Sequence, residues 1–575
     1  MDSKFDEIIE NLFNELFQRH PASATFIGGK FHEYDGKMES GTIEDVEKDI
    51  ALMKKVKAKL RDLDPGQLSA ANRLDRELLL QLIALQLFQQ EERKEWEKVV
   101  TSQGGPVATI GAALFPLFTR SFAPFETRAR SIIDRLRGST AFLENSKQQW
   151  RRPIKLWTQI AIQECQTVPG FFGVIHQAIQ TEAPHLADEF QTVAGEVASK
   201  IQEYQQFLET EVLPRATDEW AYGREGFEKL LQLRKLPYTA DEILALGEKY
   251  REELKNELEE LAKEMDPNCT SWEEVREKIK TKTPPDFEQT LAAIRKATET
   301  AQQFIIKEKL ATVAEGTGMQ VLETPEYMRP LIPFAALIPA ELLSESQISE
   351  YVVTPGSTNS FLTEYGSASL YNVSVHEGFP GHHLQISHGN LFGGSIIRVL
   401  AAGFETVEGW AHYCEQMMLE EGFYDDKNVD AKEILFIQKL DALWRAIRII
   451  LDVKLHTHQI SFEEAIELLV TERGMPREGA AAEVTRYTMA PGYQLNYLVG
   501  KHLFLELREQ LKAKLGDKFS LLWFHDILLR TGGIPFHYLK QVYMEKAEDY
   551  WLNGKKFHKP NYVANKSKML LWCLY

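Results

Sequence analysis

The sequence predicts a mainly α-helical protein, built as one large helical fold with a deep groove and a small β element. Apolar residues recur at helical spacing over most of the chain. Prolines cluster between Pro325 and Pro355, which excludes a long helix there. The chain has 575 residues, 44% hydrophobic and 26% charged, which is enough apolar material for a large folded core.

Several segments show the helical pattern clearly. From Phe5 to Phe17 the apolar residues form one stripe, and the same spacing continues from Ile43 to Leu63 and from Leu68 to Phe88. Asp64-Pro65-Gly66 separates the latter two segments as a turn. The sequence Thr239-Ala240-Asp241-Glu242 is typical of a capping box and predicts the start of another long helix.

The proline-containing region is expected to form the β element. Its strand candidates are Ala335–Ile338 and Tyr351–Val353, shortly before the histidine-rich segment. We expect three regions: an N-terminal helical region over 1–220, a helical connecting region over 221–325 and a metal-binding region over 326–575. Together they would form one compact, two-lobed unit.

Charge and cysteine content exclude several classes of protein. The net charge of −18 argues against nucleic acid or an anionic membrane as the main partner. The N-terminus lacks a basic start and an apolar run, and no stretch approaches the ~18 apolar residues of a membrane helix. The four cysteines form no CxxC pair, which fits a reducing compartment. We expect a soluble, cytoplasmic protein.

A histidine-rich segment carries the clearest chemical signal. Four of the 15 histidines lie within 13 residues, and Glu377 directly follows the first of them, His376. Imidazole and carboxylate are the ligands that catalytic zinc prefers, usually three from the protein with a water in the fourth position. A glutamate next to the first histidine is the arrangement of zinc hydrolases in which it acts as the general base.

The spacing departs from HExxH, because Pro380 stands four residues after His376. On an undisturbed helix His383 would share the face of His376 and His382 would point away. Pro380 cannot donate a backbone hydrogen bond, and Gly381 permits unusual dihedral angles. A break here would return His382 to the ligand position, so we prefer His376 and His382 as ligands, with His383 as the competitor.

The third ligand is expected from another helix. Glu408, His412 and Glu415 lie at i, i+4 and i+7 on one face. Buried carboxylates are costly unless they are paired or bound to metal. Glu408 is the preferred ligand, and Glu405, His412 or Glu415 would orient the ligands by hydrogen bonds.

Hydrolysis by a metal-bound water also needs a donor for the developing oxyanion. Tyr497, Tyr487 and Arg486 are the candidates. The alternative for either tyrosine is core packing with its hydroxyl bound to backbone.

Arg445 and Arg448 are candidates for binding a substrate carboxylate, because arginine forms bidentate pairs with carboxylates. A structural salt bridge to Asp441 or Asp452 is the alternative. The strand around Tyr351 could accept an extended peptide by edge addition.

Three blocks of the sequence resemble those of domain-of-unknown-function family 885: the HE-x-x-PGHH-x-Q segment from His376, the EGWA-x-Y-x-E stretch from Glu408, and the R-Y-x-x-x-PG patch from Arg486. Two positions depart from the family pattern, with His412 replacing a usually apolar residue and Tyr493 a common glutamine. The resemblance implies a helical, gluzincin-type metallopeptidase fold with two histidine ligands, a glutamate ligand and a catalytic glutamate.

These observations together predict a zinc-dependent hydrolase of the peptidase type that acts on short peptides. One Zn²⁺ per chain is expected, and another divalent ion is compatible with these ligands. One alternative keeps the metal site but assigns it an amide or ester bond of a small molecule. The other is a non-enzymatic helical scaffold with a vestigial site.

Overall fold

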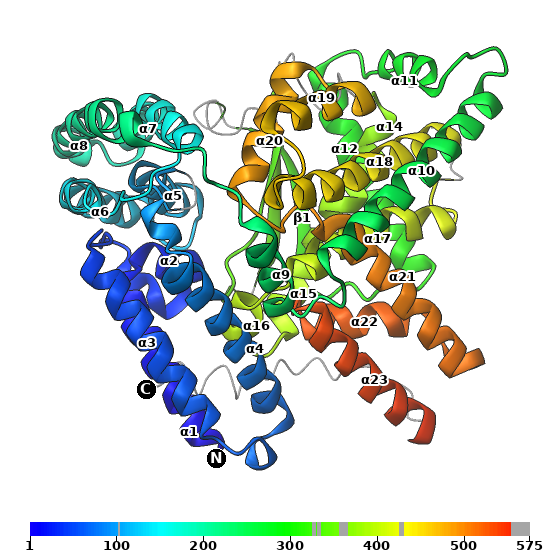
Figure 1. The fold of residues 1–575 in the computed structure, drawn as a ribbon, viewed down its shortest axis with the longest axis horizontal. Helices are drawn as coiled ribbons and strands as arrows, with labels where there is room; N and C mark the ends of the chain where they lie inside the picture. Colours follow the sequence, from blue (N-terminus) through cyan, green and yellow to red (C-terminus); the bar gives the residue numbers. More distant parts are fainter. Residues whose placement is uncertain are drawn as a thin grey trace. The chain divides into compact units, whose positions relative to one another are not determined.

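The computed structural model describes residues 1–101, 104–324, 329, 335–344, 346–355, 366–424 and 430–553. The chain forms two compact units (Figure 1). Unit 1 contains Met1–Trp220 with Glu341–Ser344, and unit 2 contains Ala221–Ala340 with Glu345–Tyr575. The expected regions 221–325 and 326–575 therefore both belong to unit 2, apart from 341–344.

Unit 1 consists of helices and short helical turns. In chain order they are α1 (Asp2–Arg19), α2 (Pro21–Ile27), η1 (Gly29–Tyr34), α3 (Ile43–Arg61), η2 (Pro65–Gln67), α4 (Ala70–Leu87), η3 (Phe88–Glu92), η4 (Glu95–Glu97), α5 (Pro106–Thr119), α6 (Phe125–Ser146), α7 (Lys155–Glu182), η5 (Pro184–Leu186), α8 (Ala187–Phe207), η6 (Leu208–Val212) and η7 (Leu213–Arg215). Arg135 is fully buried here and donates to the carbonyl oxygens of Lys37, Ala113 and Tyr34, which ties α5, α6 and η1 together.

Unit 2 is also mainly helical. Its helical elements are α9 (Gly223–Leu233), α10 (Ala240–Met265), α11 (Trp272–Lys280), α12 (Phe287–Lys307), α14 (Ala368–Val373), η9 (Ser374–Gly378), α15 (His382–Phe392), α16 (Ile396–Leu400), α17 (Phe404–Glu420), α18 (Ala431–His456), α19 (Phe462–Arg473), α20 (Arg477–Met489), α21 (Asn496–Leu515), η10 (Gly516–Lys518), α22 (Leu521–Thr531) and α23 (Phe536–Asn553). The mainly α fold class predicted from the sequence is confirmed.

The predicted helices begin and end close to their expected bounds, for identifiable reasons. Thr42 caps α3 by accepting from the amide of Asp45, and Asp64 supplies the same contact in the turn after it. The predicted capping box is present, since Thr239 and Glu242 bind each other's backbone amides at the start of α10. Local side-chain chemistry therefore fixes these boundaries.

A three-stranded sheet in unit 2 precedes the histidine-rich segment, as expected. Its strands are β1 (Thr317–Glu323), β2 (Ala335–Ile338) and β3 (Gln347–Val353), in the order β1-β3-β2. β3 pairs in parallel with β1 and antiparallel with β2. The two strand candidates are confirmed as β2 and the end of β3, whereas β1 was not expected. Pro325, Pro330 and Pro333 lie outside the described residues.

The sheet has a defined hydrophobic contact with the helices. Leu291 and Ile294 of α12 pack with Val321, Tyr351, Val353 and Leu370 in one buried cluster. This cluster holds β3 next to α14, the helix that leads directly into the histidine-rich segment.

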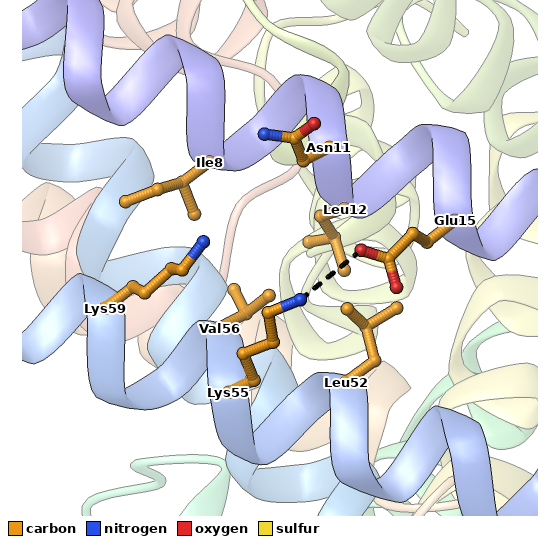
Figure 2. A pocket seen from close by; sticks show the side chains of 8 residues that line it. All are labelled: Ile8, Asn11, Leu12, Glu15, Leu52, Lys55, Val56 and Lys59. Atoms are coloured by element: carbon orange, nitrogen blue, oxygen red, sulfur yellow. Dashed lines mark ion pairs between the residues drawn. The ribbon is translucent and has the colours of Figure 1, made fainter.

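A pocket of about 220 Å³ lies between α1 and α3 in unit 1 (Figure 2). Figure 2 shows an ion pair across it, and Lys55 Nζ lies 3.7 Å from Glu15 Oε1. None of the candidate site residues lines this pocket, and the deep central groove expected of the enzyme stays a prediction. Among the described residues, no helix is both long and apolar enough to cross a bilayer.

Candidate metal centre

Three side chains from separate elements of unit 2 converge on one point. His376 comes from η9, His382 from the first position of α15 and Glu408 from α17. Glu408 Oε2 lies 3.3 Å from His382 Nε2 and 3.8 Å from His376 Nε2. The two imidazole rings are nearly perpendicular, with centroids 4.7 Å apart. All three potential ligand atoms lie within 4.8 Å of one another.

The local backbone explains how His382 reaches this position. The chain widens into a π-helical turn at Ser374–Gly378 and leaves the helix at Phe379. The Phe379–Pro380 peptide bond is cis. Gly381 then donates its amide to the carbonyl of Val375 over 3.0 Å, and a Cβ there would lie 1.9 Å from the carbonyl oxygen of His376. Only glycine permits this close return of the chain, which starts α15 at His382.

His383, the competing ligand, faces elsewhere. Its Nδ1 lies 2.8 Å from Ser349 Oγ of β3, and its ring packs on Phe379. Burial lowers the pKa of His383 to about 4, so the ring is neutral in the core. The structure thus brings His382, not His383, to His376 and Glu408.

Helix α17 is held by two close contacts. Trp410 Nε1 donates to the carbonyl of Pro380 over 2.8 Å, which ties the helix to the turn before His382. On another face, a Cβ on Gly409 would lie 2.5 Å from Gly500 Cα of α21. The two glycines let the helix backbones approach closely, which places Tyr497 at the start of α21 near Glu408.

A buried carboxylate orients the first histidine. Glu415 Oε1 lies 2.7 Å from His376 Nδ1, and its Oε2 lies 3.1 Å from His412 Nδ1. Because an ionised carboxylate only accepts, Nδ1 of His376 carries a proton toward Glu415, and Nε2 is the nitrogen that faces Glu408. Asn372 donates to Glu415, and Arg445 Nη2 lies 3.9 Å from it. Glu415 therefore makes the orienting contact predicted for it, and His412 contacts the other oxygen of the same carboxylate.

In this cluster, burial and charge pairing shift the pKa values of the side chains in opposite directions. Burial alone would lower the pKa of His376, but the carboxylates of Glu408 and Glu415 raise it to about 10. Burial would raise the pKa of Glu408, whereas His376 and His382 hold it well below its usual range. The pKa of Glu415 is likewise held low against burial, chiefly by His412 and His376. Both carboxylates are therefore ionised at neutral pH.

Tyr493, noted in the sequence only as a departure from the family pattern, contacts a candidate ligand. Its hydroxyl donates to Glu408 Oε1 over 2.7 Å, which leaves Oε2 for the two histidines. Burial and the charge of Glu408 raise the pKa of Tyr493. The signal in the sequence was its place beside the Pro491-Gly492 turn, but its partner lies 85 positions away, in helix α17.

Tyr497, predicted to donate to an oxyanion, lies in the same neighbourhood. Burial and the nearby charge of Glu408 raise the pKa of Tyr497, so its hydroxyl keeps its proton. The guanidinium groups of Arg445 and Arg448 lie over its ring at 5.7 and 5.1 Å. The structure thus brings Tyr497 toward the three candidate ligands.

Tyr487, Arg486 and Arg448 gather around Glu483 instead. Glu483 Oε2 accepts from Tyr487 over 2.7 Å, from Arg486 over 2.7 Å and from Arg448 over 3.0 Å. The polar groups of Tyr487 and Arg486 are therefore committed to this carboxylate and are not brought to the ligand cluster. Arg448 has the alternative role, a structural salt bridge, although its partner is Glu483 and not an aspartate.

Two further expectations need correction. Glu405 was expected to orient the ligands, but its oxygens accept from Arg234 over 2.9 Å and from the amide of Phe536 over 3.0 Å. Edge addition of a peptide at Tyr351 is wrong, because β3 is the central strand and its backbone is paired on both sides. For Arg445, the alternative of a structural salt bridge is present, because its Nη1 lies 3.4 Å from Asp441 Oδ1.

Tyr351 is linked to the site by its side chain rather than its backbone. It is buried in the sheet cluster, and burial together with the charge of Glu377 raises its pKa. Glu377 itself follows His376 in the π-helical turn and is partly exposed. The charge of Glu377 also raises the pKa of His376, so its carboxylate lies near that ring, and its role as the general base stays a prediction.

Comparison with known proteins gives a family and a fold. A model for bacterial proteins of unknown function, DUF885, matches residues 21–542. The chain belongs to this family. No curated protein matches.

Two solved structures resemble this DUF885 protein over nearly their whole length. A proposed lipoprotein of unknown function from Shewanella oneidensis has 22% identity and a TM-score of 0.77, covering 94% of this chain and 99% of its own. A proposed lipoprotein from Colwellia psychrerythraea has 19% identity and a TM-score of 0.81, covering 95% and 99%. At this level of identity the comparison shows a shared fold.

The donor set of this DUF885 protein fits a divalent cation. Glu408 Oε2 is buried and forms no hydrogen bond, although two imidazole nitrogens face it. The two imidazole nitrogens lie 3.3 and 3.8 Å away, and a cation shared with them would stabilise this buried carboxylate oxygen better than these long contacts do. Two histidines and a glutamate, with a second carboxylate behind one histidine, are the donor chemistry that zinc prefers.

Proposed function

We propose that this protein is a zinc-dependent hydrolase of the peptidase type, acting on short peptides. The observation that carries the proposal is the convergence of His376 Nε2, His382 Nε2 and Glu408 Oε2, with Glu377 directly following the first ligand. A purely structural ion-pair cluster would not need a partly exposed glutamate directly after the first histidine.

Each residue has a definite task in this proposal. His376, His382 and Glu408 would hold the metal, which supplies Lewis acidity and lowers the pKa of a bound water toward ~7. Glu377 accepts the proton of the attacking water and passes it to the leaving amine. Tyr497 donates a hydrogen bond from its hydroxyl to the oxyanion that develops on the substrate carbonyl. Glu415 keeps the His376 ring in the orientation that presents Nε2.

The decisive variant is Glu377→Gln. We expect it to keep the metal and to lose turnover by about 10²- to 10⁴-fold, because the amide cannot accept the proton of the water. The measurement is kcat on a peptide panel, with metal content determined by elemental analysis. Glu421→Gln, an exposed glutamate after α17, is the matched control and should behave as wild type. Retention of most of the activity by metal-replete Glu377→Gln would show that the general-base assignment is wrong.

Ligand variants test the metal independently of turnover. His376→Ala and Glu408→Ala should each lose bound zinc, and full stoichiometry in both would rule out this ligand set. A panel that pairs peptides with non-peptide amides and esters separates a peptidase from the small-molecule alternative. No bound zinc and no chelator-sensitive activity in wild type would favour the non-enzymatic scaffold.

A further inference from the structure

An exposed aromatic residue stands one helical turn before the candidate ligand Glu408. Phe404 is the first residue of α17, and 53% of its surface is exposed. The other aromatic residues of this helix, Trp410 and Tyr413, are fully buried. A single exposed apolar side chain needs no explanation by itself, so the case for Phe404 depends on the rings that it contacts.

Phe404 is the outer member of a row of rings that ends at the ligand cluster. Its ring packs edge-to-face on Tyr493, with centroids 5.3 Å apart and an interplanar angle of 61°. Tyr493 packs edge-to-face on Tyr497 at 6.1 Å and 78°. The hydroxyl of Tyr493 is bound to Glu408 Oε1. The row therefore leads from an exposed ring to a candidate ligand within one helical turn.

The hydroxyl of Tyr493 is already hydrogen-bonded, which determines the kind of ligand that this row of rings can contact. Its hydroxyl donates to Glu408, so the ring is what remains for contact with a neighbouring molecule. Phe404 has no polar atom in its side chain. Aromatic rings arranged at angles to each other favour a further ring or a large aliphatic group, because such contacts combine apolar burial with favourable ring geometry.

We propose that Phe404 and Tyr493 form the contact surface for an apolar, preferentially aromatic, substrate side chain next to the bond that is cleaved. The proposal rests on the proposed hydrolase function, and it names the substrate class for that site. It holds for a peptide or a small-molecule amide, because it concerns the group beside the reacting carbonyl.

The first test is a change in selectivity. The substrates are an all-alanine pentapeptide and a series of pentapeptides in which one alanine, at each position in turn, is replaced by phenylalanine. The quantity compared is the ratio of kcat/KM for the phenylalanine peptide to kcat/KM for the all-alanine peptide. Phe404→Ala should lower this ratio about 10- to 100-fold, the range that apolar contacts give in substrate discrimination. Phe404→Tyr, which keeps a ring, should restore most of it.

The matched control is Phe26→Ala in unit 1, which removes an aromatic residue that is 60% exposed and outside the candidate site. Its ratio should equal that of wild type. An unchanged ratio in Phe404→Ala, or an equal fall in both variants, would overturn the proposal.

A binding measurement separates this proposal from the proposed function. Calorimetric titration of the Glu377→Gln protein with the same peptides reads the contact without turnover. Tighter binding of the phenylalanine peptide that is lost in the Glu377→Gln/Phe404→Ala protein supports the aromatic contact, even if wild type proves to hydrolyse nothing. Equal binding of both peptides contradicts it, even if zinc-dependent hydrolysis is found.

Discussion

Among single residues, Glu415 affects the metal site without being a ligand, because it orients His376. It is fully buried, accepts from His376 and His412, and leaves His376 only one ring nitrogen to present toward Glu408. A ligand held in this way loses less freedom on binding a cation than one that rotates.

Glu415→Gln should therefore weaken zinc binding. The amide can still accept one hydrogen bond, but it lacks the charge that holds the proton on His376 Nδ1, so we expect about 10- to 100-fold lower affinity. Competition with a chelator of known affinity measures it. The exposed Glu421→Gln variant is the control, and an unchanged zinc Kd in Glu415→Gln would contradict the orienting role.

The ligand residues show how far the sequence alone could lead. His376, Glu377 and Glu408 follow from residue type and spacing, because carboxylates and imidazoles concentrated on apolar helices have few other uses. The choice of His382 rather than His383 as a ligand depended on how Pro380 and Gly381 break the helix. The sequence indicated that break but not its geometry. The contact of Tyr493 with Glu408 was not predicted, because this hydrogen bond joins a loop to a helix far away in the chain.

Among the elements, side chains of α18 hold the loop between α20 and α21 by hydrogen bonds to its backbone. Asp452 is buried and accepts from the amides of Gly492 and Gln494, each over 3.0 Å. His456, one turn later, lies with its Nε2 3.1 Å from the carbonyl oxygen of Tyr487. These contacts hold both ends of the loop that carries Tyr493, and so set where its hydroxyl meets Glu408.

Asp452 should make stability depend on pH. Burial raises its pKa from 3.8 to about 7, although the amides of Gly492 and Gln494 act in the opposite direction. The folded state then holds a proton that the unfolded state releases, so this contribution to stability is complete below about pH 4 and lost as the pH rises through 7. Linkage limits the slope to about 1.4 kcal/mol per pH unit between these values.

The measurement is urea unfolding of wild type and Asp452→Asn between pH 5 and 8. The stability of wild type relative to the variant should fall as the pH rises, because asparagine does not titrate. A difference that is constant or grows with pH would show that Asp452 is ionised throughout.

The helices themselves were predictable because their causes are local. The apolar stripes of α1, α3 and α4 and the capping box of α10 are contained in a few consecutive residues. β1 was missed because a parallel strand depends on pairing with β3, thirty positions later in the chain. Tyr351 was assigned to an edge because strand order is a tertiary property.

At the scale of the whole molecule, the fold is shared well beyond the site. The DUF885 family match spans 21–542, and the two solved structures cover most of the chain. The candidate metal centre lies entirely within unit 2, where Gly409 and Gly500 bring α17 and α21 close together and Trp410 ties α17 to the turn before α15. The architecture therefore positions the ligands, while the proposed chemistry depends on six side chains.

The most direct test of the central claim is a crystal structure of the protein grown with zinc, with anomalous data collected on both sides of the zinc absorption edge. We predict one strong peak per chain, about 2.0–2.2 Å from His376 Nε2, His382 Nε2 and a carboxylate oxygen of Glu408. The absence of a peak among these three atoms, or a zinc ion bound by His383 in place of His382, would contradict the account.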